Sequence, residues 1–174
     1  MIIFYFIIWL VALVLIIAAL LPKYFELKAE TTINAPIQKV WDYVKLFENQ
    51  KYYSIWVMKD PNSVLNYSGE QGTVGAKQNR NSTMRDVGAG EQEIISLQEP
   101  TKMEVEVRFE RPMKATNKAT NILVDMGNNQ TKISNIFTGK NPRPGNFISM
   151  FFLPKVKKDM QNNMNNLKVQ VEKA

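Results

Sequence analysis

The sequence of 174 residues contains neither histidine nor cysteine. Without histidine there is no Ser-His-Asp or Cys-His nucleophilic machinery and no metal site of the usual histidine-based kinds. Without cysteine no disulfide can form, so a hydrophobic core must hold the chain together. The absence of cysteine does not indicate whether the protein lies in an oxidising or a reducing compartment. Any general acid or base would have to be an Asp, Glu, Lys or Tyr with a shifted pKa. We therefore expect no metal and no cofactor, and an enzymatic role is the less favoured one.

The beginning of the chain also lacks charge. No charged side chain occurs from Ile2 to Leu21, and fifteen of these twenty residues are Ile, Leu, Val or Phe. Twenty helical residues rise about 30 Å, which matches the hydrocarbon thickness of a bilayer. A cleaved signal peptide is the alternative, but no Lys or Arg precedes the apolar run and the run exceeds a normal signal core. We predict a transmembrane anchor over residues 1–22, followed by one domain over residues 23–174.

Two lysines, Lys23 and Lys28, flank the C-terminal side of this segment, whereas the N-terminal side offers only the α-amine. By the positive-inside rule, the chain is expected to be a single-pass membrane protein whose soluble domain lies on the cytoplasmic side. The bilayer is thus one expected partner. The sequence leaves the oligomeric state open.

The net charge of +6 is concentrated near the end of the chain, because seven basic and two acidic side chains follow from Lys140 onward. Lys155, Lys157 and Lys158 form the densest group and are candidates for contact with an anionic lipid surface. A solvated helix face is the alternative interpretation. Nucleic acid is not an expected partner, since no aromatic stacking platform interleaves with these lysines.

Periodicity organises the rest of the chain into a single α+β domain. Residues 24–33 alternate between apolar and polar and predict a strand with one buried face. Pro36 introduces a helix, and a second short helix is expected at 50–55. A long helix over 147–172, interrupted or kinked by Pro154, ends the domain. Between the helices, strands are expected at 64–67, 76–81, 91–97, 101–110, 117–124 and 131–138.

The long final helix carries one apolar seam, formed by Met160, Met164, Leu167 and Val171 at spacings of four, three and four. Its opposite face is rich in asparagine, a mediocre helix former. This helix should therefore depend on packing rather than on its own propensity, which leaves room for motion. Lying across a curved sheet is the economical way to bury the seam.

Several segments resemble one known family. Residues 33–44, with the sequence INAPIQKVWDYV, resemble the opening of the START-like superfamily in its polyketide cyclase/dehydrase (SRPBCC) branch, and residues 67–76, 88–94 and 139–142 resemble later stretches in the right order. The resemblance covers about residues 28–171. It implies a helix-grip fold, in which the sheet curls around the C-terminal helix and leaves a cavity. It also implies binding of hydrophobic small molecules or lipids, with catalysis in a minority of members.

In such a fold, soft and aromatic side chains on the inner faces are expected to line the cavity. The candidates are Met103, Val105, Phe109, Ile133, Asn135, Phe137, Met150, Phe151, Met160 and Met164. The alternative for each is that it packs into a solid core. Asn135 is an exception, because a polar amide on an apolar face needs a partner from protein, water or ligand, unless the strand is shifted and turns it outward.

Other polar features have simpler explanations. Glu91 and Glu93 share one strand face, as paired catalytic carboxylates might, but we expect solvated acids on the outside of the sheet. The glycine-rich stretch at 69–75 lacks the Gly-Lys-Ser/Thr ending of a phosphate-binding loop, so hairpin geometry explains it better.

Three functions remain open at this stage. The favoured one is a membrane-anchored domain that binds a hydrophobic small molecule or lipid between the sheet and the C-terminal helix, with this helix as the gate. The second is a polyketide cyclase/dehydrase-like enzyme that uses the same cavity. The third is a partner-binding or stress-related module, for which the basic final helix is the only support.

Overall fold

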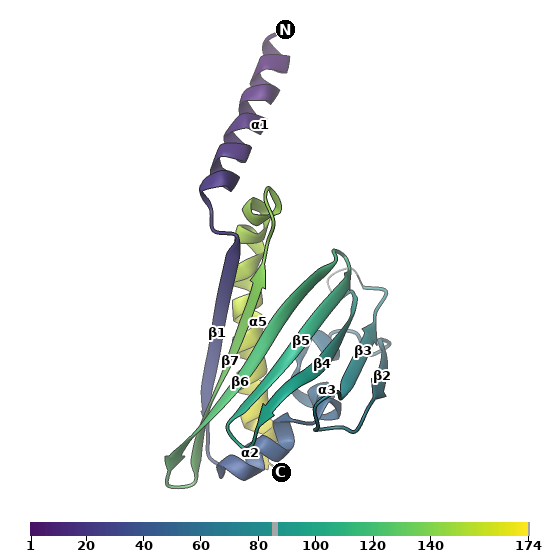
Figure 1. Cartoon of the computed structure of the whole chain (residues 1–174), viewed down its shortest axis with the longest axis vertical. Helices are drawn as coiled ribbons and strands as arrows, with labels where there is room; N and C mark the ends of the chain where they lie inside the picture. Colours follow the sequence, from purple (N-terminus) through teal and green to yellow (C-terminus); the bar gives the residue numbers. More distant parts are fainter. Residues whose placement is uncertain (85–86, 174) are drawn as a thin grey trace.

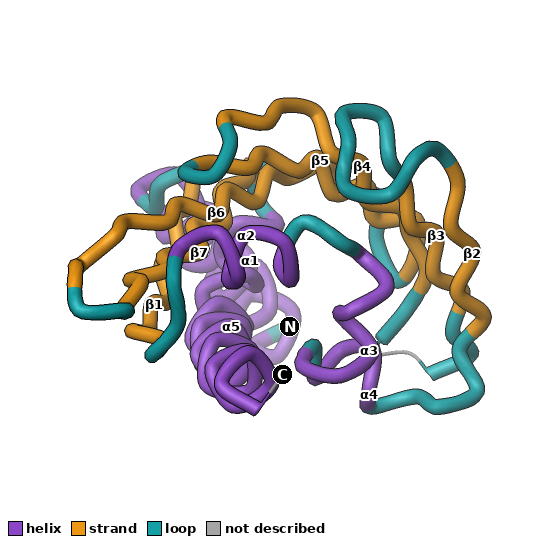
Figure 2. The backbone as a smooth tube through the Cα atoms, turned by 90° about the horizontal axis from the view of Figure 1, so that it is seen from below, coloured by secondary structure: helices purple, strands orange, loops and turns teal. Residues whose placement is uncertain are grey.

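In the computed structural model, which describes residues 1–84 and 87–173, a curved seven-stranded sheet wraps around a long C-terminal helix (Figures 1 and 2). The helices are α1 (Ile2–Leu20), α2 (Ile37–Val44), the 3-10 turn η1 (Phe47–Asn49), α3 (Gln50–Tyr53), α4 (Ile55–Met58) and α5 (Gly145–Lys173). The strands are β1 (Tyr24–Ile33), β2 (Val64–Ser68), β3 (Lys77–Asn81), β4 (Ala89–Gln98), β5 (Lys102–Arg111), β6 (Ala115–Gly127) and β7 (Gln130–Lys140).

The strands are ordered β1-β7-β6-β5-β4-β3-β2 in the sheet, and all neighbours are antiparallel. This order places the first strand beside the last, so the segment with α2, α3 and α4 runs from one edge of the sheet to the other. The predicted α+β helix-grip fold is confirmed. The final helix differs in detail, because α5 begins at Gly145 and continues through Pro154 without a break.

The core lies between the concave face of the sheet and α5, at the end of the domain away from α1. Its fully buried members are Ile33, Trp41, Val40, Phe47, Ile94, Ile133, Leu167 and Val171. Met160 and Met164 are buried in the same cluster, so the predicted apolar seam of α5 faces the sheet. At about 25 cal/mol per Å² of buried apolar surface, this cluster is the main source of the domain's stability.

Polar side chains of α5 attach its C-terminal half to the outer edge of β1. An edge strand presents unpaired N–H and C=O groups on alternate residues, and these need partners. Gln161 Nε2 donates to the Glu30 carbonyl at 3.0 Å, and its Oε1 accepts from the Glu30 N–H at 3.4 Å. Lys168 Nζ donates to the Thr32 carbonyl at 2.5 Å, and just after the strand Glu172 Oε1 accepts from the Asn34 N–H at 2.7 Å. The helix thereby covers the edge strand while it buries its seam.

The N-terminal helix α1 projects away from the domain (Figure 1), and Ala18 is its one buried residue. With a mean hydropathy of 3.1, it is long and apolar enough to span a membrane, as judged by length and composition. The short connection from α1 to β1 keeps the start of the domain close to the end of this helix.

Candidate functional site

The concave face is closed in the half that lies away from α1. Met103 and Val105 of β5, Ile133 of β7, and Met160 and Met164 of α5 are all buried there. These side chains point inward, and almost none of their surface is accessible to water. In this half of the interior they pack as a solid core, which is the alternative considered above.

Nearer to α1 the same face is less well covered. Val107 and Phe109 of β5, Ala119 of β6 and Phe137 of β7 are only partly buried, although alternation points them inward. Phe137 packs on Phe25 of β1, with ring centroids 5.8 Å apart. The inner surface at this end of the grip is therefore apolar and still partly accessible.

Met150 and Phe151 do not lie where an enclosed cavity would place them. Met150 is 43% exposed and Phe151 63% exposed. When the buried seam is continued one turn at a time toward the start of α5, it passes through Val156, Leu153, Ser149 and Asn146. Phe151 lies on the opposite face and is directed outward, whereas Met150 lies at the border of the seam and is partly exposed.

Asn135 does face the interior, and its partner comes from the protein. Its Nδ2 donates to Oδ1 of Asn121 at 2.7 Å, and the two residues are directly opposed in the β6–β7 register. Asn121 is only 8% exposed. This hydrogen bond gives each amide a partner within the protein, so the polar group on the apolar face does not require a ligand.

A second group of amides crosses the concave face and was not foreseen from the sequence. Gln92 of β4 donates to Gln50 of α3 at 2.7 Å and also to Gln78 of β3, which in turn donates to the Tyr67 hydroxyl at 3.3 Å. Gln78 is buried. Alternation with Glu91 and Glu93 placed Gln92 on the opposite face, but periodicity alone could not say which face is internal.

Glu91 and Glu93 lie on the convex face and are paired. Arg108 Nη2 contacts both carboxylates at 2.5 Å, and Lys77 Nζ lies 3.4 Å from Glu91 and 3.3 Å from Glu93. The hydrogen bonds from Arg108, followed by those from Lys77, hold the pKa of both carboxyl groups below the ordinary value. Both are thus charged at neutral pH and poorly suited to act as general acids. Within residues 1–84 and 87–173, no three acidic side chains gather where they could hold a metal ion.

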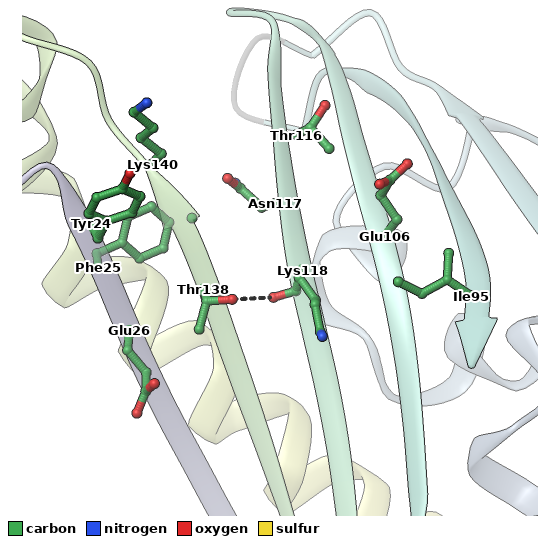
Figure 3. A pocket seen from close by; sticks show the side chains of 11 residues that line it. Tyr24, Phe25, Glu26, Ile95, Glu106, Thr116, Asn117, Lys118, Thr138 and Lys140 are labelled. Carbon is green, nitrogen blue, oxygen red and sulfur yellow. Dashed lines mark hydrogen bonds between the residues drawn. The ribbon is translucent and has the colours of Figure 1, made fainter. Parts of the chain in front are cut away.

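A cleft of about 550 Å³ opens where β6 and β7 separate, at the end of the sheet nearest α1 (Figure 3). The pairing of β6 with β7 begins at Lys118 and Thr138, and beyond it β6 pairs only with β5 and β7 only with β1. Asn117 and Phe25 can approach this part of β7 only because residue 139 is glycine, since a Cβ there would lie 2.2 Å from Oδ1 of Asn117 and 2.7 Å from the Phe25 ring. Asn117 and Phe25 thus fill the gap between the strands.

The three candidate membrane-surface lysines, Lys155, Lys157 and Lys158, are exposed on α5. No salt bridge joins them to a carboxylate in the part of the chain that the structure describes. They lie in the turn after Phe151, on the portion of α5 toward α1.

Comparison with solved structures supports the fold. A protein from Chromobacterium violaceum is 14% identical with a TM-score of 0.62, covering 87% of this chain and 99% of its own. A conserved protein from Geobacillus kaustophilus is 11% identical with a TM-score of 0.63, over 86% and 96% of the two chains. The Aha1 dimer from Colwellia psychrerythraea is 16% identical with a TM-score of 0.59, over 85% and 96%. At such identities the likeness establishes the fold alone.

No curated protein matches the chain in sequence. The family model described as polyketide cyclase / dehydrase and lipid transport matches residues 24–172 and leaves out the segment that contains α1. This match spans all seven strands and nearly all of α5. The chain therefore belongs to the polyketide cyclase/dehydrase and lipid transport family.

Proposed function

We propose that this protein holds a hydrophobic small molecule or lipid between the concave face of the sheet and α5, while α1 anchors it in a membrane. One observation carries the proposal: Val107, Ala119 and Phe137 point inward yet remain partly exposed, at the end of the domain next to α1. Apolar side chains on an inner face are normally covered, and a ligand pocket is the usual reason for leaving them accessible. The family description, which names lipid transport, agrees with this ligand class.

The polar groups of the concave face suit an amphiphilic ligand. The amide pair of Asn121 and Asn135 and the chain from Tyr67 to Gln50 border the apolar surface. Ligand pockets are mostly apolar with a few placed polar groups that fix orientation. A molecule with a long apolar part and one polar end would use both kinds of surface.

Helix α5 is the expected gate, and its two halves are held differently. In the C-terminal half, Asn163 Oδ1 accepts from the Ile55 N–H at 2.8 Å and Asn166 Nδ2 donates to the Tyr53 carbonyl at 3.1 Å. Pro154 lies before this half and has no N–H for the carbonyl of Met150, so the helix is weakest there. We expect α5 to bend at Pro154 when a ligand enters, so that the part before Pro154 moves together with the end of α1 relative to the sheet.

A cyclase/dehydrase-like reaction in the same place has less support. The paired carboxylates Glu91 and Glu93 lie outside the concave face and form ion pairs with Arg108 and Lys77. Tyr53 is buried, and burial raises the pKa of its phenol, so it stays neutral at physiological pH. No specific observation favours this reaction over binding.

We also propose that the boundary between anchor and domain falls at Pro22–Lys23, with the domain over residues 23–174 on the cytoplasmic side. The charges of Lys23 and Lys28 support this orientation. Protease added outside intact cells should leave the domain uncut, and complete digestion of the domain there would contradict the orientation.

The binding test compares two tryptophan substitutions on β6 in the full chain, extracted in a mild detergent. Ala119→Trp fills the accessible part of the concave face, whereas Thr120→Trp places the same ring on the convex side of the same strand. We expect Ala119→Trp to weaken binding of a fluorescent fatty acid by about tenfold or more, equivalent to about 1.4 kcal/mol. Thr120→Trp should leave the affinity unchanged.

Native mass spectrometry of the unmodified chain provides the second measurement. A retained mass of lipid size would support the proposal. Bare protein, together with equal and negligible fatty acid binding in both variants, would refute it.

A further inference from the structure

An exposed apolar patch covers one side of the first turns of α5. Ile148 is 56% exposed, Phe151 63% and Phe152 60%. Their spacing of three and four places them on one helix face, whereas Asn146, which is buried, lies on the face toward the rest of the protein. The patch is therefore not an extension of the core seam. Three large side chains left in water at one place indicate an interaction surface.

The patch lies next to the end of α1. Arg143 Nε donates to the Ala18 carbonyl at 3.0 Å, and Asn146 Nδ2 donates to the carbonyls of Ala18 at 2.8 Å and Leu21 at 3.2 Å. These are carbonyls of the last turn of α1, which have no partner within the helix. The start of α5 is thus fixed beside the C-terminal end of α1, as Figure 1 also shows.

We propose that the first two turns of α5 lie in the headgroup layer of the membrane that α1 spans. This inference rests on the anchoring role of α1 proposed above. Ile148 and Phe152 follow Gly145 by three and seven residues, so the patch begins about 4.5 Å and ends about 10.5 Å along the helix from Gly145, an extent of about 6 Å. The headgroup layer on each side of a bilayer is about 5 to 7 Å thick, so the patch spans this layer. Aromatic and aliphatic side chains are stabilised at this depth.

The charges of α5 follow the order that such a position requires. Lys155, Lys157 and Lys158 come one turn after the apolar patch, farther from α1. At that distance their ammonium groups reach the outer edge of the headgroups, where an anionic lipid surface attracts them. The apolar residues are nearest to the bilayer and the lysines follow farther along the helix axis. The polarity of α5 therefore changes along its length, not between two faces.

A lipid surface fits the patch better than a second copy of the chain. The patch is continuous with the end of a helix that is itself apolar enough to span a bilayer. Tyr24, 69% exposed at the start of β1 with Lys140 Nζ 5.7 Å from its ring, adds an aromatic and a cation at the same end of the domain. This combination of aromatic and basic residues is typical of a membrane interface. Contact with the membrane would also place the accessible end of the concave face beside the lipids.

The test uses the natural absence of cysteine to introduce one fluorescent label at a time into the full chain. Labels are attached at Phe152→Cys in the patch, at Leu10→Cys in α1 and, as a matched control, at Val169→Cys, which is 45% exposed on the far end of the same helix. The protein is reconstituted into vesicles of phosphatidylcholine and phosphatidylglycerol that contain spin-labelled lipids. We expect strong quenching at position 10, clear quenching at 152 and none at 169.

Each outcome has one interpretation. Quenching at 10 with position 152 behaving like 169 would overturn the inference while leaving the anchor intact. No quenching at 10 would overturn the anchor and with it the membrane part of the proposed function. A spectral shift at 152 without lipid quenching would mean that protein, such as a second copy, covers the patch, which also overturns the inference.

A second measurement tests the role of charge. Replacing Lys155, Lys157 or Lys158 by Gln should lower the ratio of docked to undocked α5 by about fivefold for each lysine in anionic vesicles. Raising the salt concentration should also lower the ratio of docked to undocked α5, because salt screens exposed charges. Quenching at 152 that ignores both lysine removal and salt would contradict the electrostatic part of the inference.

Discussion

The amide pair between Asn121 and Asn135 offers a sharp test of how the interior is built. Leucine has the same branched skeleton of heavy atoms as asparagine, so Asn121→Leu and Asn135→Leu each remove one partner of a 2.7 Å hydrogen bond while keeping the number of side-chain heavy atoms. Each single variant leaves a desolvated amide without a partner, which costs about 1–3 kcal/mol. The double variant removes both polar groups, so its stability should lie close to that of the unmodified chain. The expected coupling, which is the sum of the two single losses when the double variant costs nothing, is therefore about 2–6 kcal/mol.

Urea denaturation of the full chain in a mild detergent, followed by tryptophan fluorescence, to which the buried Trp41 contributes, measures these differences. Asn162→Leu, at an exposed position of α5, controls for the general effect of the substitution and should change stability by less than about 0.5 kcal/mol. If the two single losses simply add up in the double variant, the pair is not coupled and the reasoning fails. In that case each amide would be hydrogen-bonded to water rather than to the other amide.

The same variants separate structure from ligand contact. If the amides only hold β6 to β7, the double variant should bind a fluorescent fatty acid as the unmodified chain does. Reduced affinity in a fully stable double variant would instead mean that the amides touch the ligand. In that case Asn135 would have the ligand as a partner, which is one of the three kinds of partner expected for it from the sequence.

Three further outcomes can be measured on the same protein. Leu167→Ala removes a fully buried side chain and should lower the free energy of unfolding by about 2–5 kcal/mol, whereas Val169→Ala on the exposed face should change it by less than about 0.5 kcal/mol in the same urea titration. Hydrogen bonds from Lys28 and Lys132 lower the pKa of Glu30 from 4.5 to about 2. Its contribution to stability is therefore present above pH 4.5 and is lost as the pH falls toward 2. Glu30→Gln should flatten the dependence of stability on pH in that window, and an unchanged dependence would contradict this. Pro154→Ala restores a helical N–H and should slow fatty acid uptake measured by stopped flow, while faster uptake would contradict a hinge at this residue.

The sequence predicted the fold well because the strongest periodic signals coincide with its main elements. The alternation in 24–33 became β1, and the seam from Met160 to Val171 became the buried face of α5. Both signals arise from burying one face of a regular element, which the local sequence records directly. The helix-grip topology came from the resemblance, since periodicity cannot order strands in a sheet.

The accessible end of the interior was predicted less well, for two physical reasons. The stretch from Phe147 to Leu153 is apolar on nearly all sides, so no amphipathic pattern marks which side faces the sheet. The cavity candidates Met150 and Phe151 are 43% and 63% exposed there. The position of Gln92 depended on which side of β4 is concave, which follows from sheet curvature rather than from alternation. Such features are set by tertiary packing and are not visible in a single segment.

The asparagines of α5 show how a local weakness can determine the behaviour of the whole helix. As helix formers they contribute little, but Asn163 and Asn166 bind the backbone of Ile55 and Tyr53, and so they hold the C-terminal half of α5 in place. The half before Pro154 has no such contact with the α3–α4 segment; Asn146 holds its first turn to the end of α1, and its apolar side chains are exposed there. Motion should therefore be confined to the half next to the membrane. A ligand that enters there would pass between the bilayer and the apolar end of the concave face without crossing water.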